Sequence, residues 1–477
     1  MRLGVAAVLS CMLMSCAMGP DYKRPDVGTS DSFRLASGSD ATSLANLAWW
    51  ELLKDAELQK LVRVALDENR DLRRAVATVD EFRARALVAR SDYLPGLTAT
   101  ANAPVLGRKS IFLFPGFANP FNYYLQGSLN WELDVWGRIR RSNEAALKDL
   151  LAREDNQRAV VLQLVSGVAE AYFDLLQFDM QYDIAKRTLQ SWEESVRIAQ
   201  ARLRQGMTSK LDSDQFEAER ANAAARTAEL ERQRVQKENQ LSVLLGRRPY
   251  PVARGRSLTE QVMPPEVPAG LPSDLLQRRP DLMQAEEQLA AATARIGAAK
   301  AERFPKISLT GILGVASPQL SKLFTDPASY GVAGPSLASP LLNAQILGFQ
   351  QEAVEAQARQ AQAQYEQTVL TAFKEVEDAL IAVKTSRDQR EAQQIQVNAL
   401  QSALHLAELR YKGGLANYLD VLVARRSLFD AELALSGTHR LHLVSIVQLY
   451  KALGGGWMAE GAPLPQAVPA SSNANRG

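Results

Sequence analysis

Aromatic residues and net charge are both scarce in this chain. Phe, Trp and Tyr make up only 7% of the sequence, and 55 basic residues against 53 acidic ones leave a formal charge of +2. So small a charge gives no reason to expect a nucleic acid as partner. Ala, Gln, Leu, Arg and Glu instead crowd two long regions that are poor in Pro and Gly. This composition favours long packed helices over the compact core of an enzyme.

Cysteine and histidine are also rare, and this limits the chemistry that the chain can perform. Of the two cysteines, Cys11 lies in an apolar N-terminal segment, so the mature chain would keep only Cys16 and form no disulfide. His439 and His442 lie three residues apart without further Cys or His nearby, which favours solvated helix residues over a metal site. The sequence also lacks a Gly-rich phosphate loop and a recognisable Ser/His/Asp arrangement. It therefore offers no catalytic residue, no metal site and no cofactor site.

The N-terminus predicts export and lipid attachment. Arg2 precedes an apolar run from Leu3 to Met14, which is too short to span a bilayer but suits a secretory signal. The run ends in Leu-Met-Ser-Cys, which resembles a bacterial lipobox with Cys16 as the lipidated first residue. The alternative is that Cys16 merely follows a signal cleaved at another site. Ala17, in place of an aspartate, resembles the pattern of lipoproteins sent to the outer membrane.

One short pattern occurs twice and indicates an internal duplication. Each copy has a glycine that ends one helix, a Ser or Asn that caps the next, and an aspartate three residues later. These residues are Gly206, Ser209 and Asp212 in the first copy and Gly414, Asn417 and Asp420 in the second. The two glycines are 208 residues apart (414 less 206), and so are the two aspartates. Each copy reads as a tip between two long helices.

Two periodicities divide the rest of the chain. Polar and apolar residues alternate strictly from Tyr124 to Val135, which predicts a strand with one wet and one dry face. Residues 138–205 contain no proline and one interior glycine, which predicts a helix of roughly 100 Å. The predicted organisation begins with a signal peptide (1–15) and a lipidated arm (16–48) and ends with a disordered tail (458–477). Between them lie a first repeat (49–250) and a second repeat (273–457), joined by a Pro-rich connector (251–272). The first repeat has a β-hairpin at about 94–137 and helices at about 138–205 and 211–245, and the second has a hairpin at about 305–342 and helices at about 344–411 and 419–453.

The predicted strands require more than one chain. A sheet in lipid must close, because an open edge leaves backbone groups without partners, and the four strands of one chain cannot close a barrel. Three chains would supply twelve strands, which is within the range of outer-membrane barrels. The long helices likewise need partners along their whole length, which a ring of helices around a wet lumen would provide. Four aromatic residues suit a girdle at the barrel rim, although ordinary packing suits them nearly as well: Tyr123, Tyr124, Trp131 and Trp136.

Five motifs in order carry a resemblance to a known family. They are CAMGPDYKRP from Cys16, NRDLR from Asn69, WELDVWGR from Trp131, RRPDL from Arg278 and YKALGGGW from Tyr450. Together they resemble the TolC-type outer-membrane efflux channels, and more closely their lipoprotein branch of the OprM and NodT type. The resemblance covers nearly the whole mature chain. It implies a mixed α and β membrane protein: a homotrimer with a twelve-stranded barrel in the outer membrane, continuous with a long α-helical barrel in the periplasm.

The resemblance also places a gate just after the second tip. Carried over position by position, the constriction of the family falls on Leu419, Val423 and Arg426, with Val423 where close relatives have an aspartate. Asp212 and Asp420 are candidates to restore an acidic ring, because three copies of each would attract cations in a narrow lumen. The alternative, which we favour, is that both carboxylates complete helix caps; one residue can do both. The tips themselves are the expected docking points for an adaptor: Gly206, Gly413, Gly414 and Leu415.

The sequence therefore predicts a passive exit duct of a tripartite efflux pump. The resemblance implies a periplasmic membrane-fusion (adaptor) protein and an inner-membrane transporter, commonly of the resistance-nodulation-division (RND) class, as partners. Alternatives within transport are a duct for metal ions or for type I secretion of proteins or peptides. A rival of another class is a lipid-anchored periplasmic coiled-coil scaffold without a pore. The transported substrate does not follow from the sequence, because the transporter selects it.

Overall fold

A computed structural model describes residues 17–28, 33–34, 48–103, 123–262, 272–340, 343–416 and 418–455. The predicted signal peptide, Cys16, Asn417 and the tail lie outside these residues. The chain divides into two compact units: unit 1 takes Met1–Asp26, Thr78–Glu154 and Gln284–Glu366, and unit 2 takes Val27–Ala77, Asp155–Met283 and Gln367–Gly477. Each unit contains parts of both sequence repeats, so the repeats are not two separate domains.

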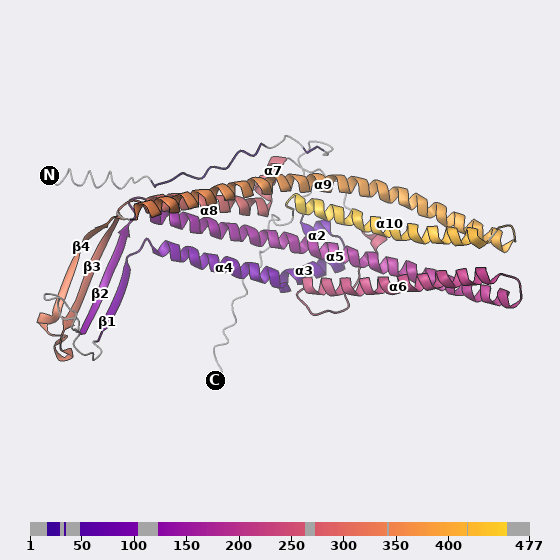
Figure 1. Ribbon diagram of the computed structural model, residues 1–477, viewed down its shortest axis with the longest axis horizontal. Helices are drawn as coiled ribbons and strands as arrows, with labels where there is room; N and C mark the ends of the chain where they lie inside the picture. Colours follow the sequence, from indigo (N-terminus) through magenta and orange to yellow (C-terminus); the bar gives the residue numbers. More distant parts are fainter. Residues whose placement is uncertain are drawn as a thin grey trace. The chain divides into compact units, whose positions relative to one another are not determined.

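Unit 1 contains a four-stranded antiparallel sheet in the order β1-β2-β3-β4 (Figure 1). The strands are β1 (Gly96–Asn102), β2 (Tyr123–Leu133), β3 (Lys306–Ser317) and β4 (Ser329–Ala338), with two short turns of 3₁₀ helix, η3 (Leu320–Lys322) and η4 (Asp326–Ala328), between the last two. The central pair β2 and β3 joins the two repeats, from Tyr123 opposite Ser317 to Leu133 opposite Ile307. β1 and β4 form the edges of this sheet, and edge strands present backbone groups for further pairing.

The strand register gives the sheet one continuous apolar face. Leu97 lies opposite Leu129, Leu129 opposite Gly311, and Gly311 opposite Ala333, so these side chains share a face. Leu97, at 77% exposure, is not covered by the rest of the chain. The other face is polar on β1 and β2, as the alternation predicts. On β3 and β4 it carries Ile312 and Val332 as well, so the alternation is weaker there.

Each repeat places its strands between long helices. In the first, α4 (Arg70–Ser91) precedes β1 and α5 (Arg138–Arg204) follows β2; in the second, α8 (Pro280–Ala301) precedes β3 and α9 (Ala344–Lys412) follows β4. The returning helices are α6 (Lys210–Leu244) and α10 (Tyr418–Ala452). All four long helices begin and end within one residue of the predicted ranges. α5 contains a stretch apolar enough to cross a membrane, but 61% of that stretch is buried inside the protein, which is typical of a core helix.

Unit 2 is mainly helical. It also holds α2 (Trp49–Leu52), α3 (Ala56–Glu68), the short 3₁₀ helix η2 (Leu258–Glu260) and α7 (Pro272–Arg278). The apolar face of α10 is deeply buried in this unit, with Leu443, Val447 and Tyr450 each below 5% exposure. These side chains fall at spacings of four and three residues, which place them on one side of a helix.

Four helices end in the same glycine conformation. Gly206, Gly246, Gly414 and Gly454 have φ values of +69°, +70°, +73° and +71°. In each case the next residue donates its backbone N–H to a carbonyl five residues back, as Met207 does to Arg202 at 2.9 Å. This is the Schellman helix end, which requires φ > 0. Gly246 and Gly454, at the far ends of α6 and α10, are also 208 residues apart (454 less 246), so the period that the two tips predict recurs there.

Candidate channel gate and docking tips

The first tip is a closed turn with a complete capping box. The Ser209 hydroxyl oxygen accepts a hydrogen bond from the Asp212 N–H at 3.1 Å, and Asp212 Oδ2 accepts from the Ser209 N–H at 3.3 Å. The Thr208 hydroxyl donates to the same carboxylate oxygen at 3.0 Å. These bonds from Ser209 and then Thr208 lower the pKa of Asp212 below its usual range. Asp212 thus has the capping role that the sequence favoured.

The second tip repeats the turn with an additional glycine. Gly413 donates its N–H to the Leu409 carbonyl at 3.0 Å, and Gly414 then turns the chain toward α10. The predicted cap Asn417 lies outside the described residues. Large apolar side chains are exposed at both tips: Met207 and Leu211 at the first, and Leu415 at the second, each above 65%. Exposed apolar groups gathered at a turn are typical of a surface that binds another protein.

The gate residues implied by the resemblance share one face of α10. Leu419 and Val423 are each 53% exposed, and the Arg426 side chain is 60% exposed with Glu219 at 3.7 Å. Their spacing of four and three residues aligns them along the helix. Asp420 is also exposed and adjoins this face. The structure therefore brings Leu419, Val423 and Arg426 together on an exposed face of α10, where Arg426 pairs with Glu219 of α6, whereas Asp212 lies on α6 at the other tip.

The opposite face of α10 packs into an aromatic cluster that sequence reasoning missed. Tyr418, Val421 and Leu422 are buried there against Trp192 of α5 and Phe216 of α6. The Phe216 and Tyr418 rings lie 3.8 Å apart, and the Trp192 and Phe216 rings 6.4 Å apart. The available signal was the presence of aromatic residues near the tips in a chain where such residues are rare. This cluster fixes which side of α10 can face outward.

Residues 18–24 pack against the rest of unit 1 at defined contacts. Met18 donates its N–H to the Trp136 carbonyl at 3.1 Å, at the junction of β2 and α5. Gly19 packs so closely on α8 that a Cβ on it would lie 2.4 Å from the Gly297 Cα. The Arg24 guanidinium then binds both carboxylate oxygens of Glu286, at 2.8 and 2.6 Å. The arm therefore starts beside the end of the sheet and follows α8 away from it, because residue 297 lies nearer β3 than residue 286.

Trp136 packs at this junction. Its indole N–H donates to the Pro305 carbonyl at 2.9 Å, and its ring stacks on Phe304 at 4.9 Å. Trp131 also donates its indole N–H, to the Tyr93 carbonyl at 3.0 Å. Hydrogen bonds therefore hold both indole rings in place.

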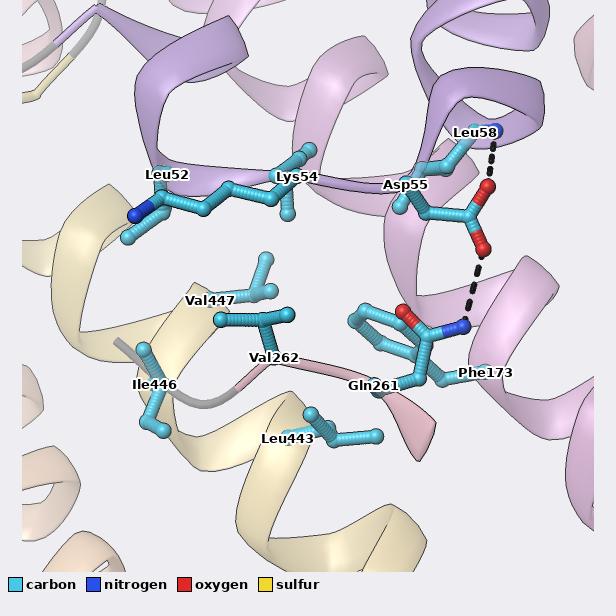
Figure 2. A pocket seen from close by; sticks show the side chains of 11 residues that line it. Leu52, Lys54, Asp55, Leu58, Phe173, Gln261, Val262, Leu443, Ile446 and Val447 are labelled. Atoms are coloured by element: carbon cyan, nitrogen blue, oxygen red, sulfur yellow. Dashed lines mark hydrogen bonds between the residues drawn. The ribbon is translucent and has the colours of Figure 1, made fainter. Parts of the chain in front are cut away.

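The buried carboxylate of Asp55 in unit 2 has a structural role as a helix cap. Asp55 is 3% exposed and caps α3 through the Glu57 and Leu58 N–H groups. Burial raises its pKa, but the hydrogen bonds led by Gln261 outweigh burial, so the net pKa lies below the usual range. Figure 2 shows the cavity beside it, lined by Leu52, Phe173, Gln261, Leu443 and Val447 among others. Its volume is about 20 Å³, which suits one water molecule and excludes a substrate.

The histidine prediction was wrong in one respect. His442 is not solvated but 6% exposed, and its Nδ1 lies 3.0 Å from the Ser386 hydroxyl of α9. Burial lowers the pKa of both His439 and His442, because it disfavours the charged imidazolium. The face of α10 that carries them packs inward, which a spacing of three residues alone could not reveal. Among the described residues no group of three or more His, Cys, Asp or Glu could hold a metal ion.

Comparison with known proteins identifies the family. The family model described as "Outer membrane efflux protein" matches residues 61–247 and 271–455, one match for each repeat. The chain is 36% identical over 460 residues to the probable efflux pump outer membrane protein TtgC of Pseudomonas putida, covering 94% of this chain and 95% of that protein. It is 34% identical over 452 residues to the cation efflux system protein CusC of Escherichia coli, covering 93% and 96%.

The fold agrees with a solved channel of the same kind. The structure of the open state of the Neisseria gonorrhoeae MtrE outer membrane channel superposes with a TM-score of 0.83 and 33% identity, covering 93% of this chain and 99% of that one. Sequence and fold agree over almost the same length. The chain therefore belongs to the outer membrane efflux protein family, a family of channel proteins of the outer membrane that extend into the periplasm.

Proposed function

We propose that three copies of this chain form the passive exit duct of a tripartite efflux pump. Each copy supplies four strands to a twelve-stranded barrel in the outer membrane and its long helices to a barrel that crosses the periplasm. A periplasmic membrane-fusion (adaptor) protein grips the tips at Gly206, Gly413, Gly414 and Leu415. An inner-membrane transporter of the RND class supplies the energy, and the duct itself catalyses no reaction.

The observation that carries this proposal is a sheet with two open edges and an exposed apolar face. Such a sheet is unfavourable in lipid as four strands, because the edges of β1 and β4 would leave backbone groups unpaired. Pairing β1 of one copy with β4 of the next removes every edge after three copies. The names of the relatives include antibiotic, solvent and cation efflux, and we assign the choice of substrate to the transporter.

Gel migration tests the closed barrel. Purified from outer membranes, the protein should run as a compact trimer in unheated detergent samples and as an unfolded monomer after boiling, because a closed barrel resists detergent. A lipid-anchored scaffold without a barrel would run as a monomer in both lanes. That result would exclude the duct.

We further propose that the exposed face of α10 forms the gate at the periplasmic mouth, through Leu419, Asp420, Val423 and Arg426, and that Asp212 at the other tip adds a carboxylate to the same mouth. Replacing Asp212 and Asp420 together by Asn should lower cation preference severalfold, because six negative charges leave the trimer's mouth. Reversal potentials in a salt gradient measure this preference. Asp214→Asn is the matched control, since Asp214 is exposed on α6 and pairs with Lys210 of the same helix. If the double variant keeps the wild-type reversal potential, both carboxylates are helix caps alone.

We also propose that Cys16 carries the lipid anchor. The bond from the Met18 N–H to the Trp136 carbonyl supports this, because it holds Ala17, the residue after Cys16, beside the end of the sheet that we propose enters the membrane. The intact mass of the mature protein should equal the chain from Cys16 plus a diacylglyceryl group and an N-acyl chain. Cys16→Ser should remove all of this added mass. A wild-type mass without acyl groups would contradict the assignment.

A further inference from the structure

Four large side chains interrupt the polar face of the sheet. This face carries Ser, Thr, Asn and Gln at most positions of β1 and β2, as expected of a face that a closed barrel turns to its water-filled lumen. Tyr124, Ile312, Tyr330 and Val332 lie on the same face, and we call them the distal patch. The exposed fractions of Tyr330 and Val332 are 37% and 66%. Apolar groups gathered on a wetted surface are typical of a binding site.

Tyr330 is held in place by a hydrogen bond that spans the neighbouring strand. Tyr330 lies opposite Gly314 of β3, which in turn lies opposite Gln126 of β2. The Tyr330 hydroxyl donates to Gln126 Oε1 at 2.8 Å, so the side chain crosses β3 on the polar face. A glycine is needed at this crossing, because a Cβ on Gly314 would lie 2.8 Å from the Gln126 Cβ. The hydrogen bond therefore fixes the ring without covering it.

The distal patch occupies one level of the sheet. Tyr124 and Tyr330 are each the second residue of their strands, at the end farthest from α5 and α9. Ile312 and Val332 are paired with each other, and Val332 is two residues nearer the helices than Tyr330. On the described strands, the rest of this face toward the helices holds only small or polar side chains. Three copies of the chain would thus place twelve such side chains, four from each copy, in one band around the lumen.

The chemistry of the distal patch favours ligands that contain an aromatic ring. Covering its exposed apolar surface is favourable for any apolar group, and the tyrosine rings also attract aromatic rings and cations. The residues paired with the patch in the strand register are uncharged, namely Asn102, Ser128, Gly314 and Ala316. The patch therefore repels neither neutral nor cationic aromatic molecules.

We propose that the distal patch is a binding site for aromatic small molecules in the lumen of the duct. The inference rests on the proposed function, because the polar face borders a lumen only when three copies close the barrel. Binding at this site is weak, since a molecule that passes through a channel must be able to leave each site that it meets. Exported molecules with an aromatic ring are therefore retained briefly in the barrel, and molecules without one pass freely.

Transient block of the single-channel current tests the distal patch. Benzyltrimethylammonium, an aromatic cation, should interrupt the current of the wild-type trimer, whereas tetramethylammonium, which has the same charge but no ring, should not. Replacing Tyr330 and Val332 together by Thr should shorten the blocked intervals on the order of tenfold, because the ring contact and much of the apolar surface are lost. Tyr123→Thr is the matched control, since it removes a tyrosine from the other face of β2, and should be blocked as wild type.

The outcomes distinguish failure of the patch from failure of the duct. If wild type conducts but is not blocked, or the double variant is blocked for as long as wild type, the patch is wrong and the duct stands. If the wild-type trimer carries no current, the proposed function itself fails. Should the double variant fail to assemble, Val332→Thr alone keeps the bond between Tyr330 and Gln126. It should shorten the blocked intervals severalfold, and wild-type intervals would overturn the patch.

Thiol labelling tests independently which face of the sheet borders water. Val332→Cys should react with a charged, membrane-impermeant thiol reagent and lose conductance, because this side chain borders the lumen. Leu313→Cys, at a position on the apolar face that is 74% exposed in the single chain, should be shielded by lipid and keep its conductance. Wild type treated with the same reagent gives the background. Preferential labelling of Leu313→Cys would place the distal patch against lipid and overturn the site.

Discussion

Gly246→Ala is expected to destabilise the protein by roughly 3 kcal/mol or more. Gly246 has a φ of +70°, and an alanine there would place its Cβ 2.3 Å from the Glu68 carbonyl oxygen. The left-handed conformation alone costs about 1–2 kcal/mol. The clash of the new Cβ with the Glu68 carbonyl adds a further free-energy cost. It cannot be relieved by moving α6 or the start of α4 without breaking the hydrogen bond of 2.8 Å from Asn69 Nδ2 to the Leu244 carbonyl.

Gly206→Ala separates the two costs. Gly206 has nearly the same φ, +69°, but open space where the Cβ would stand. Gly206→Ala should therefore lower the free energy of unfolding only by the cost of the left-handed conformation, about 1–2 kcal/mol. Loss of helical circular dichroism on heating in detergent compares the two variants. If Gly246→Ala and Gly206→Ala melt at the same temperature, the close approach of α6 to Glu68 does not contribute.

Asp55→Asn is the second substitution with a large expected effect, roughly 3–5 kcal/mol of destabilisation. The Asp55 carboxylate accepts five hydrogen bonds and donates none. Its donors are the N–H groups of Glu57, Leu58 and Arg256, the Tyr172 hydroxyl and the Gln261 amide. An asparagine would turn an NH₂ group toward at least two of these donors, so that buried donors would be left unsatisfied.

The effect of Asp55→Asn should depend on pH in a defined direction. The pKa of Asp55 is lowered in the folded protein, so its stabilisation is full above its unfolded pKa of about 4 and is lost as pH falls through the folded pKa. The difference between wild type and variant should therefore be largest near neutral pH and shrink below about pH 4. Asp214→Asn is the control and should cost less than about 1 kcal/mol. If the stability difference between wild type and Asp55→Asn stays constant down to pH 2, Asp55 is not charged in the folded protein.

The helices and tips could be predicted from the sequence because their signals are local. The Gly206 turn and the absence of proline from 138 to 205 are sufficient to place the ends of α5 within one residue. The four strands could be predicted for a similar reason, since alternation reports one wet and one dry face. The family resemblance assigns Leu419, Val423 and Arg426 to a gate, and the structure adds that all three are exposed on one face of α10.

The contacts between distant segments could not be predicted in this way. Asp55 and Gln261 are 206 residues apart, and no periodicity links them. Arg425 reads in the sequence as one of two adjacent arginines, Arg425 and Arg426, yet one is nearly buried and the other exposed. His442 was assigned to the wrong environment for the same reason. Only the packing of α10 against α5 and α9 decides which side of the helix each residue occupies.

The returning helices of the two repeats, α6 and α10, end at equivalent hydrogen bonds. Asn69 binds the Leu244 carbonyl at the end of α6, and Arg279 Nη1 binds the Ala452 carbonyl at the end of α10 at 3.0 Å. The two carbonyls are 208 residues apart (452 less 244), the same period as the tips. The sequence motifs NRDLR and RRPDL are therefore equivalent junctions, in which the residue before a helix binds the end of the returning helix.

Conductance of the purified trimer in planar lipid bilayers tests the central claim most directly. The account predicts discrete, reproducible current steps for wild type, and larger or longer steps for Leu419→Ala, in which the proposed constriction is widened. A trimer that inserts and resists detergent, yet passes no current in either form, would contradict a continuous duct through this protein.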